Sequence, residues 1–118
     1  MGQRISSDLW VQAYLRQCRV NGSFGYLARR GAAQAGAIFV KIIVAGGSVS
    51  LYAPAPQTEL SDDLDGMDSR MFELILSADD AQIDARLSRE RDFDPDIWIV
   101  EIEDAAGNHN LPLAIKEA

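Results

Sequence analysis

The sequence is poor in the residues that build disulfide, zinc and triad sites. It holds one cysteine, Cys18, and one histidine, His109, among 118 residues. A single thiol cannot form a disulfide within the chain, and one Cys with one His cannot complete a tetrahedral zinc site. A Ser or Cys nucleophile would also have His109 as its only imidazole base, and the chain has no Gly-x-Ser-x-Gly motif. These absences disfavour disulfide scaffolds, zinc domains and triad hydrolases.

Long apolar runs and an excess of basic residues are also missing. No segment approaches the roughly 18 apolar residues of a membrane span, and no cationic start followed by an apolar run predicts a signal peptide. The 18 acidic and 11 basic residues give a formal charge of -7, which repels phosphate backbones and anionic membrane surfaces. We therefore predict a cytoplasmic protein that binds neither nucleic acid nor membranes.

What is present is enough apolar sequence for one core. The chain is 47% hydrophobic, and its length fits a single domain over residues 1–118. Its centre is residues 36–44, where apolar side chains alternate onto both sides, as in an interior strand. The Gly-Gly pair at 46–47 supplies the positive φ values of a tight hairpin turn into residues 49–53. A first strand at 24–30 is predicted to join this centre through a hairpin loop at 31–36.

Two helices with capping signals flank these strands. The first begins at Ser6 or Ser7 and ends at Asn21-Gly22. The second begins after Ser77 and ends before Pro95, between strands at 70–76 and 97–103. In strand 70–76, Phe72, Leu74 and Leu76 are predicted to share an apolar face. The order α-β-β-β-β-α-β predicts an α+β domain with a mainly antiparallel sheet of about five strands and both helices packed on one face.

Two further segments have weaker patterns. Residues 57–69 hold five acids and no base, after two prolines that leave the preceding strand. A self-repelling connection of this length predicts a mobile acidic loop, as a flexible linker or as a binding segment. The tail from residue 108 either adds a short edge strand through Leu111, Leu113 and Ile115 or frays.

A basic cluster is the first candidate site. Arg29, Arg30 and Lys41 flank the predicted first hairpin, where they could receive a small anion or an acidic partner. The glycines at 31–36 also suggest a phosphate or coenzyme A cradle. Such cradles lead into a helix whose amino end faces the anion, whereas these glycines lead into a strand. Scattered surface cations are therefore the simpler interpretation.

An acidic cluster is the second candidate site. Asp92, Asp94, Asp96 and Glu103 have the spacing of acids in an EF-hand calcium loop. The position that requires glycine is Ile97, however, and the second half of the segment alternates as a strand. The pattern favours a turn that stops the helix, and we predict no metal and no other cofactor.

Five segments of the chain form a recognisable combination: Trp10-Val11-x-Ala13-Tyr14-Leu15-Arg16-x-Cys18, Arg29-Arg30-Gly31, Ala35-Gly36-x-Ile38-Phe39-Val40-Lys41, Leu51-Tyr52-x-Pro54-Ala55-Pro56 and Phe93-Asp94-Pro95-Asp96-x-Trp98-x-Val100-Glu101-x-Glu103-Asp104. Together they resemble a bacterial family of small single-domain proteins catalogued as a domain of unknown function. The resemblance implies a free-standing bacterial cytoplasmic protein. It brings no established activity, cofactor or catalytic residue.

Because each chemical motif fails a structural requirement, the sequence favours a noncatalytic protein-binding or accessory domain. Such a domain would meet a protein partner, or a second copy of itself, through a sheet edge or the acidic loop. The alternative is a small enzyme or small-anion-binding protein that uses Arg29, Arg30 and Lys41 with Asp94 and Asp96. A deep pocket that joins these groups would favour the alternative, and a shallow surface with an exposed apolar strip would favour protein binding.

Overall fold

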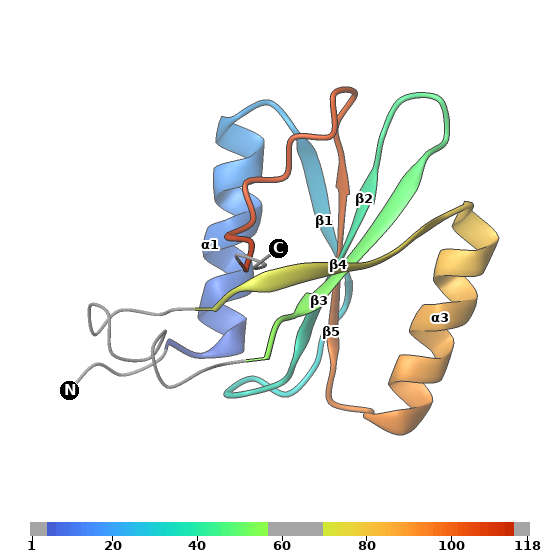
Figure 1. Ribbon diagram of the computed structural model, residues 1–118. Helices are drawn as coiled ribbons and strands as arrows, with labels where there is room; N and C mark the ends of the chain where they lie inside the picture. The colour runs from blue at the N-terminus through green and yellow to red at the C-terminus, as the bar shows by residue number, and fades with distance from the viewer. Residues whose placement is uncertain (1–4, 57–69, 115–118) are drawn as a thin grey trace.

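A five-stranded sheet separates two helices in the computed structural model, which describes residues 5–56 and 70–114 (Figure 1). In chain order the elements are α1 (Ser7–Val20), β1 (Phe24–Arg29), β2 (Ile38–Ile43), β3 (Val49–Pro54), β4 (Phe72–Ala78), α3 (Asp80–Phe93) and β5 (Trp98–Glu103). This order confirms the predicted α+β class. The predicted acidic loop at 57–69 and Ile115 of the predicted tail strand lie outside the described residues. Neither described helix is long and apolar enough to cross a membrane.

The strands lie in the order β1-β5-β2-β3-β4, and β2 pairs with β5 in parallel while the other three pairings are antiparallel. The interior position of β2 and its hairpin to β3 are confirmed, with Gly46 and Gly47 at φ of +95° and +91°. The predicted hairpin between β1 and β2 is wrong, because β5 lies between them. Most side chains of β5 are buried. An interior position removes more of their apolar surface from water than an edge position would, and this stabilises β5 between β1 and β2.

The α1 face of the sheet carries the larger cluster of buried side chains. Ser6 caps α1 by accepting a hydrogen bond from the Leu9 amide, and the helix ends at Asn21 before Gly22. The buried side chains of α1 meet alternate residues of β2 and β5, and the cluster includes Val11, Tyr14, Leu15, Cys18, Ile38, Val40, Ile42, Trp98, Val100 and Ile102. Burial in this cluster raises the pKa of the Cys18 thiol, which makes the thiol unreactive.

The second helix covers the opposite face, so the prediction of both helices on one face is wrong (Figure 1). Ile83 and Leu87 of α3 pack against the intervening residues of the strands, which include Phe39, Val49, Leu51, Ala53 and Ile99. The physical reason lies in β2, whose six residues are apolar on both sides apart from Lys41. Helices on one face alone would leave the apolar side chains of the other face in water.

A bulge changes the face of β4 part-way along the strand. Leu51 of β3 lies opposite Leu76, while Tyr52 lies opposite Leu74, so Ile75 is an extra residue. Phe72 therefore belongs to the α1 cluster, whereas Leu76 packs with the α3 cluster. The prediction that Phe72, Leu74 and Leu76 share one face is wrong, because a one-residue slip moves side chains to the other face.

The start of α3 is also shifted from its predicted place. β4 continues to Ala78, and the cap is Asp79, whose side chain accepts from the Gln82 amide while Gln82 reaches back to the Asp79 amide. This reciprocal capping box satisfies two amide groups and outcompetes the predicted Ser77 cap. Ser77 stays in the strand and pairs with Ser50.

The two edges of the sheet differ in whether another segment of the chain pairs with them. Beside β4, the Pro112 carbonyl accepts from the Phe72 amide at 2.8 Å, and the Ala114 amide donates to the Phe72 carbonyl at 2.9 Å. The tail thus adds the short edge bridge that was one of its two predicted forms, with Leu111 buried behind it. Beside β1, no described segment pairs with the outer edge. That edge is open within residues 5–56 and 70–114.

Candidate functional site

Lys41, the first of the sequence-predicted binding residues, is engaged in ion pairs under α3. Its side chain is only 5% exposed, and Nζ lies 2.6 Å from Asp80 Oδ1, 3.0 Å from Asp84 Oδ1 and 4.0 Å from Glu101 Oε2. Burial lowers the pKa of Lys41, but the hydrogen bonds with Asp80 and Asp84 outweigh burial and raise the pKa to about 12. The ammonium group is therefore charged at neutral pH and ties α3 to the sheet.

Arg29 and Arg30 are adjacent in sequence, but their side chains make contacts in different places. Arg29 Nη2 donates to the Pro95 carbonyl at 2.7 Å, beside the end of α3. Arg30 Nη1 lies 3.4 Å from Asp8 of α1, and its guanidinium group lies 5.2 Å from the centroid of the Trp98 ring. The structure does not bring the two arginines and Lys41 into one basic patch.

Asp94 and Asp96 form a local turn. Asp94 caps the carboxyl end of α3, and its Oδ1 accepts from the Asp96 amide at 3.0 Å. Glu103, the fourth acid of the calcium spacing, lies at the far end of β5. Within the described residues, no group of three or more His, Cys, Asp or Glu side chains is placed to hold a metal ion.

The glycine-rich loop at 31–36 packs tightly against the protein's own backbone. A Cβ atom on Gly31 or Gly36 would lie 2.2 or 2.3 Å from the Asp96 carbonyl oxygen. The Ala32 amide donates to that same oxygen at 2.9 Å. The glycines therefore allow the loop to cross the start of β5, and the space that a phosphate would need is occupied by chain.

An aromatic pair on the edge strand β1 was not predicted from the sequence. Phe24 is 63% exposed and Tyr26 is 38% exposed, and their ring centroids are 5.8 Å apart. Both rings lie on the α3 face, since Tyr26 is opposite Glu101 and Glu101 is opposite Lys41. Neither ring belongs to the cluster under α3. The alternation Phe24-Gly25-Tyr26 in a strand was the available signal.

Acidic side chains border this aromatic pair. The Tyr26 hydroxyl donates to Glu101 Oε1, and mainly this hydrogen bond raises the pKa of Tyr26 to about 12. Glu103 lies opposite Phe24, and a groove of about 360 Å³ extends from Phe24 past Glu103 to Ile43. We call Phe24, Tyr26, Glu101 and Glu103 the β1 edge surface. It combines apolar rings, carboxylates and a strand edge with which no segment of the described part of the chain pairs.

Comparison with known proteins identifies the family. Residues 5–112 match the family described as a protein of unknown function, DUF1491. The chain belongs to the DUF1491 family. This result confirms the resemblance that the sequence segments indicated, and the matched residues include the β1 edge surface.

Solved structures of bacterial DUF1491 relatives share the fold. The chain is 32% identical to a family member from Caulobacter crescentus, with a TM-score of 0.78, 96% of this chain covered and 100% of that one. It is 38% identical to protein Atu0922 from A. tumefaciens, with a TM-score of 0.79 and 98% of each chain covered. Among curated proteins, none matches this chain. DUF1491 membership thus establishes the fold, and function must be argued from the surface.

Proposed function

We propose that this DUF1491 protein is a noncatalytic protein-binding domain that accepts an extended segment of a partner protein along β1. The observation that supports this proposal is an edge strand that is open among the described residues and that carries two exposed aromatic side chains, Phe24 and Tyr26. An added strand would pair its backbone with the edge, and alternate side chains of that strand would contact the two rings. Proteins usually cover or blunt such an edge, so its exposure favours a binding role.

Charge selects the kind of segment that fits. Glu101 and Glu103 lie one strand inward from the two rings, and the whole chain carries a formal charge of -7. A segment that alternates apolar with Lys or Arg side chains would complement both the rings and the carboxylates. A second copy of the chain would bring another net negative charge to this edge, which disfavours self-association.

The alternative function, a small enzyme or small-anion-binding protein that uses Arg29, Arg30 and Lys41 with Asp94 and Asp96, has less support. Lys41 is already held by three carboxylates, and the arginines contact separate elements. These contacts are of the kind that stabilise a fold. They leave the β1 edge surface as the better candidate.

Two labelled peptides of opposite charge test the proposal. One alternates Val with Lys, the other alternates Val with Glu, and binding is followed by fluorescence anisotropy. We expect the Lys peptide to bind and the Glu peptide to bind much more weakly. Phe24→Ser should weaken binding of the Lys peptide by about tenfold or more, because an aromatic anchor at an interface is worth about 2 kcal/mol.

Phe93 provides a matched control. It is a second exposed phenylalanine, 89% exposed, at the last residue of α3 and outside the β1 edge surface. Phe93→Ser should leave peptide binding unchanged. Equal losses from Phe24→Ser and Phe93→Ser, or equal binding of the two peptides, would refute a specific site at β1. Light scattering at two protein concentrations separates self-association from binding of a different protein.

A further inference from the structure

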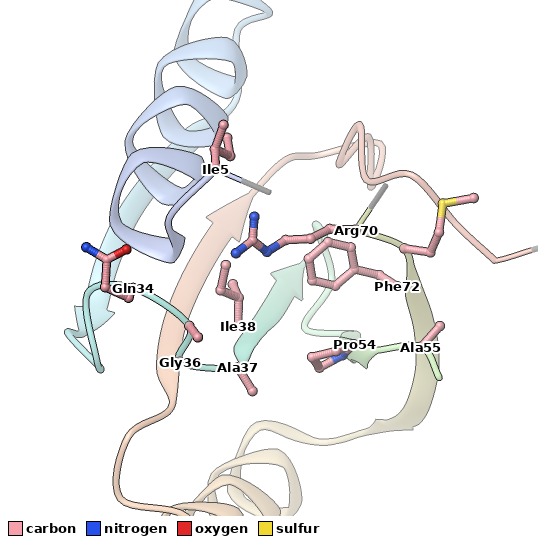
Figure 2. Close-up of a pocket in the computed structure, with 11 residues that line it drawn as sticks. Ile5, Gln34, Gly36, Ala37, Ile38, Pro54, Ala55, Arg70 and Phe72 are labelled. Carbon is pink, nitrogen blue, oxygen red and sulfur yellow. The ribbon is translucent and has the colours of Figure 1, made fainter. Parts of the chain in front are cut away.

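Two of the hollows beside α1 differ in what they offer a ligand. The pocket of about 440 Å³ in Figure 2 lies at the start of the helix, between the loop at 34–38, the end of β3 and the start of β4. Arg70 lies in its wall, but the protein's own groups already engage this guanidinium, among them Ser7 Oγ at 3.3 Å. The other described lining residues are uncharged, so this pocket offers no charge that would select a ligand.

The second hollow is an open groove of about 680 Å³ along the side of α1 that faces away from the sheet (Figure 1). Leu9 and Val20 lie at its two ends and are 54% and 79% exposed, and the small side chain of Ala13 lies between them. The exposed residues that line the groove recur at helical spacing. We call them the α1 stripe: Leu9, Gln12, Ala13, Arg16, Gln17, Arg19 and Val20.

The charge of the α1 stripe is opposite in sign to that of the whole protein. The chain has a formal charge of -7, yet no Asp or Glu occurs in residues 9–20. Arg16 and Arg19 are exposed, and within the described residues no ion pair involves either of them. Asp8, the one acid of α1, pairs with Arg30 beside the helix. The stripe is therefore a local basic surface on an acidic protein.

The exposed side of α3 lacks this separation of charge. Arg89 and Arg91 are exposed there, but Glu90 and Asp92 alternate with them along the helix. Opposite charges placed side by side cancel at short range, so α3 favours neither sign of charge in a partner. The α1 stripe, in contrast, favours an anionic partner that also carries apolar side chains.

From this contrast we infer that the α1 stripe is a docking surface for an acidic amphipathic helix of a partner protein. The apolar face of that helix would lie against Leu9, Ala13 and Val20, and its carboxylates would accept hydrogen bonds from Arg16 and Arg19. The arginines lie in the carboxyl-terminal half of α1. An antiparallel partner helix would place its amino-terminal turn there, where acidic side chains are most stable.

Other occupants fit the α1 stripe less well. A second copy of the chain would bring its own Arg16 and Arg19 into the interface, and like charges in contact disfavour association. Two cations are also fewer than the roughly four to eight that anionic membranes attract. The negative charge elsewhere on the protein does not prevent docking of an acidic helix, because about 0.1 M salt screens charges more than about 10 Å away.

Two helical peptides of opposite charge test the inference. Both carry Leu at positions i, i+3, i+4 and i+7 of one face, and the flanking positions are Glu in one peptide and Lys in the other. Binding of the labelled peptides is followed by fluorescence anisotropy. We expect the Glu peptide to bind about tenfold or more tightly than the Lys peptide at about 0.1 M salt, and this difference to shrink at about 0.5 M salt.

Matched variants localise the effect to α1. The double variant Arg16→Gln with Arg19→Gln should weaken binding of the Glu peptide about tenfold, because it removes both cations of the stripe. Arg89→Gln with Arg91→Gln makes the same change at two exposed arginines of α3 and should leave binding unchanged. Leu9→Gln should weaken binding about fivefold through the loss of apolar contact. Circular dichroism checks that each variant is folded.

Amide chemical shifts separate this inference from the proposed function. The Glu peptide should shift the amides of Gln12, Ala13 and Gln17 and leave β1 unchanged. Because the Val-Lys peptide carries the opposite charge and is expected at β1, either surface can fail its test while the other passes.

Several outcomes would overturn the inference. These are equal affinity for the Glu and Lys peptides, equal losses from the double variants of α1 and α3, or shifts by the Glu peptide confined to β1. Cosedimentation of the wild-type protein with phosphatidylglycerol vesicles would assign the stripe to a membrane surface instead. Association at high protein concentration that Leu9→Gln abolishes, measured by light scattering, would assign it to a second copy.

Discussion

The two faces of the sheet are formed by the same strands but differ in how completely their side chains are buried. On the α1 face, alternate residues of β5, namely Trp98, Val100 and Ile102, are all fully buried. On the α3 face, Ile99 is buried under α3, whereas Glu101 and Glu103 follow it along the strand and become progressively more exposed. Along β5, the α1 face is therefore buried throughout, whereas the α3 face changes from buried to exposed.

One short strand thus contributes to a closed core on one side and to a charged, partly exposed surface on the other. The alternation of β5 places Trp98, Val100 and Ile102 on the α1 side, while the α3 side changes from apolar Ile99 to charged Glu101 and Glu103. On the α3 face, the helix packs over β3 and β4 and does not cover the exposed rings of Phe24 and Tyr26 on β1. Substitutions on the two faces should therefore have different consequences.

The largest effect is expected on the closed face. Trp98→Ala would remove a fully buried ring and its hydrogen bond from Nε1 to the Ala32 carbonyl. We expect a loss of about 3–5 kcal/mol in the free energy of unfolding, measured by urea denaturation. Phe93→Ala, which truncates an exposed ring, should change stability by less than about 0.5 kcal/mol. A loss below about 1 kcal/mol for Trp98→Ala would contradict a closed core.

A smaller effect is expected from the ion pairs of the α3 face. Lys41→Met keeps the volume and apolar stem but leaves Asp80, Asp84 and Glu101 without their shared cation. We expect a loss of about 1–3 kcal/mol at neutral pH, reduced by the exposure of Asp80 and Asp84. Arg30→Met, which breaks an exposed pair with Asp8, should cost less than about 1 kcal/mol.

Alkaline pH tests the same ion pairs in the wild-type protein, without any change in the size or shape of a side chain. Because the pKa of folded Lys41 is raised from 10.5 to about 12, its stabilisation is complete below about pH 10.5 and is lost as pH rises through about 12. The wild-type protein should therefore lose stability faster than Lys41→Met over this range. Parallel curves for the two proteins would show that the ion pairs do not contribute.

The smallest effect concerns the chain segment that covers the α1 face. His109 packs against Tyr52, its Nδ1 accepts from the Leu111 amide, and its carbonyl accepts from the Tyr14 hydroxyl. Burial lowers the pKa of His109, so its contribution is present above the ordinary value of 6.5 and is lost as pH falls through the folded value. Stability should decline from pH 7.5 to about 5.5 in the wild type.

The matched variant for this decline is His109→Asn, whose side-chain oxygen can accept the same hydrogen bond but does not titrate. It should show a flatter pH dependence than the wild type when both are followed by urea denaturation. Since His109 is the single histidine of the chain, no other imidazole can mask the difference. Identical pH dependence would rule out a contribution of half-buried, neutral His109 to stability.

Local patterns predicted much of this fold. The cap at Ser6, the helix end at Asn21 and the interior strand β2 follow from a few neighbouring residues, and the structure has them where expected. The place of β5 between β1 and β2 did not follow, because strand pairing depends on contacts between residues far apart in sequence. The bulge at Ile75 was also invisible, since one extra residue leaves the apolar pattern of β4 intact.

The candidate sites were harder to predict for the same reason. Charge counts identified Lys41 but could not show that Asp80, Asp84 and Glu101 surround it. The pocket lined by Gly36, Pro54 and Phe72 is formed by segments far apart in sequence, so no local motif marks it. The exposure of Phe24 and Tyr26 depends on how far α3 extends across the sheet. That distance is set by packing and not by the sequence of β1.

The most direct test of the account is to map binding of the Val-Lys peptide by amide chemical shifts and by contacts between peptide and protein backbones. We predict that the shifts concentrate in β1 (Phe24–Arg29) and that the peptide backbone pairs with its outer edge. Shifts confined to the exposed side of α1 or to α3, with β1 unchanged, would contradict the central claim that the open edge of the sheet is the binding surface.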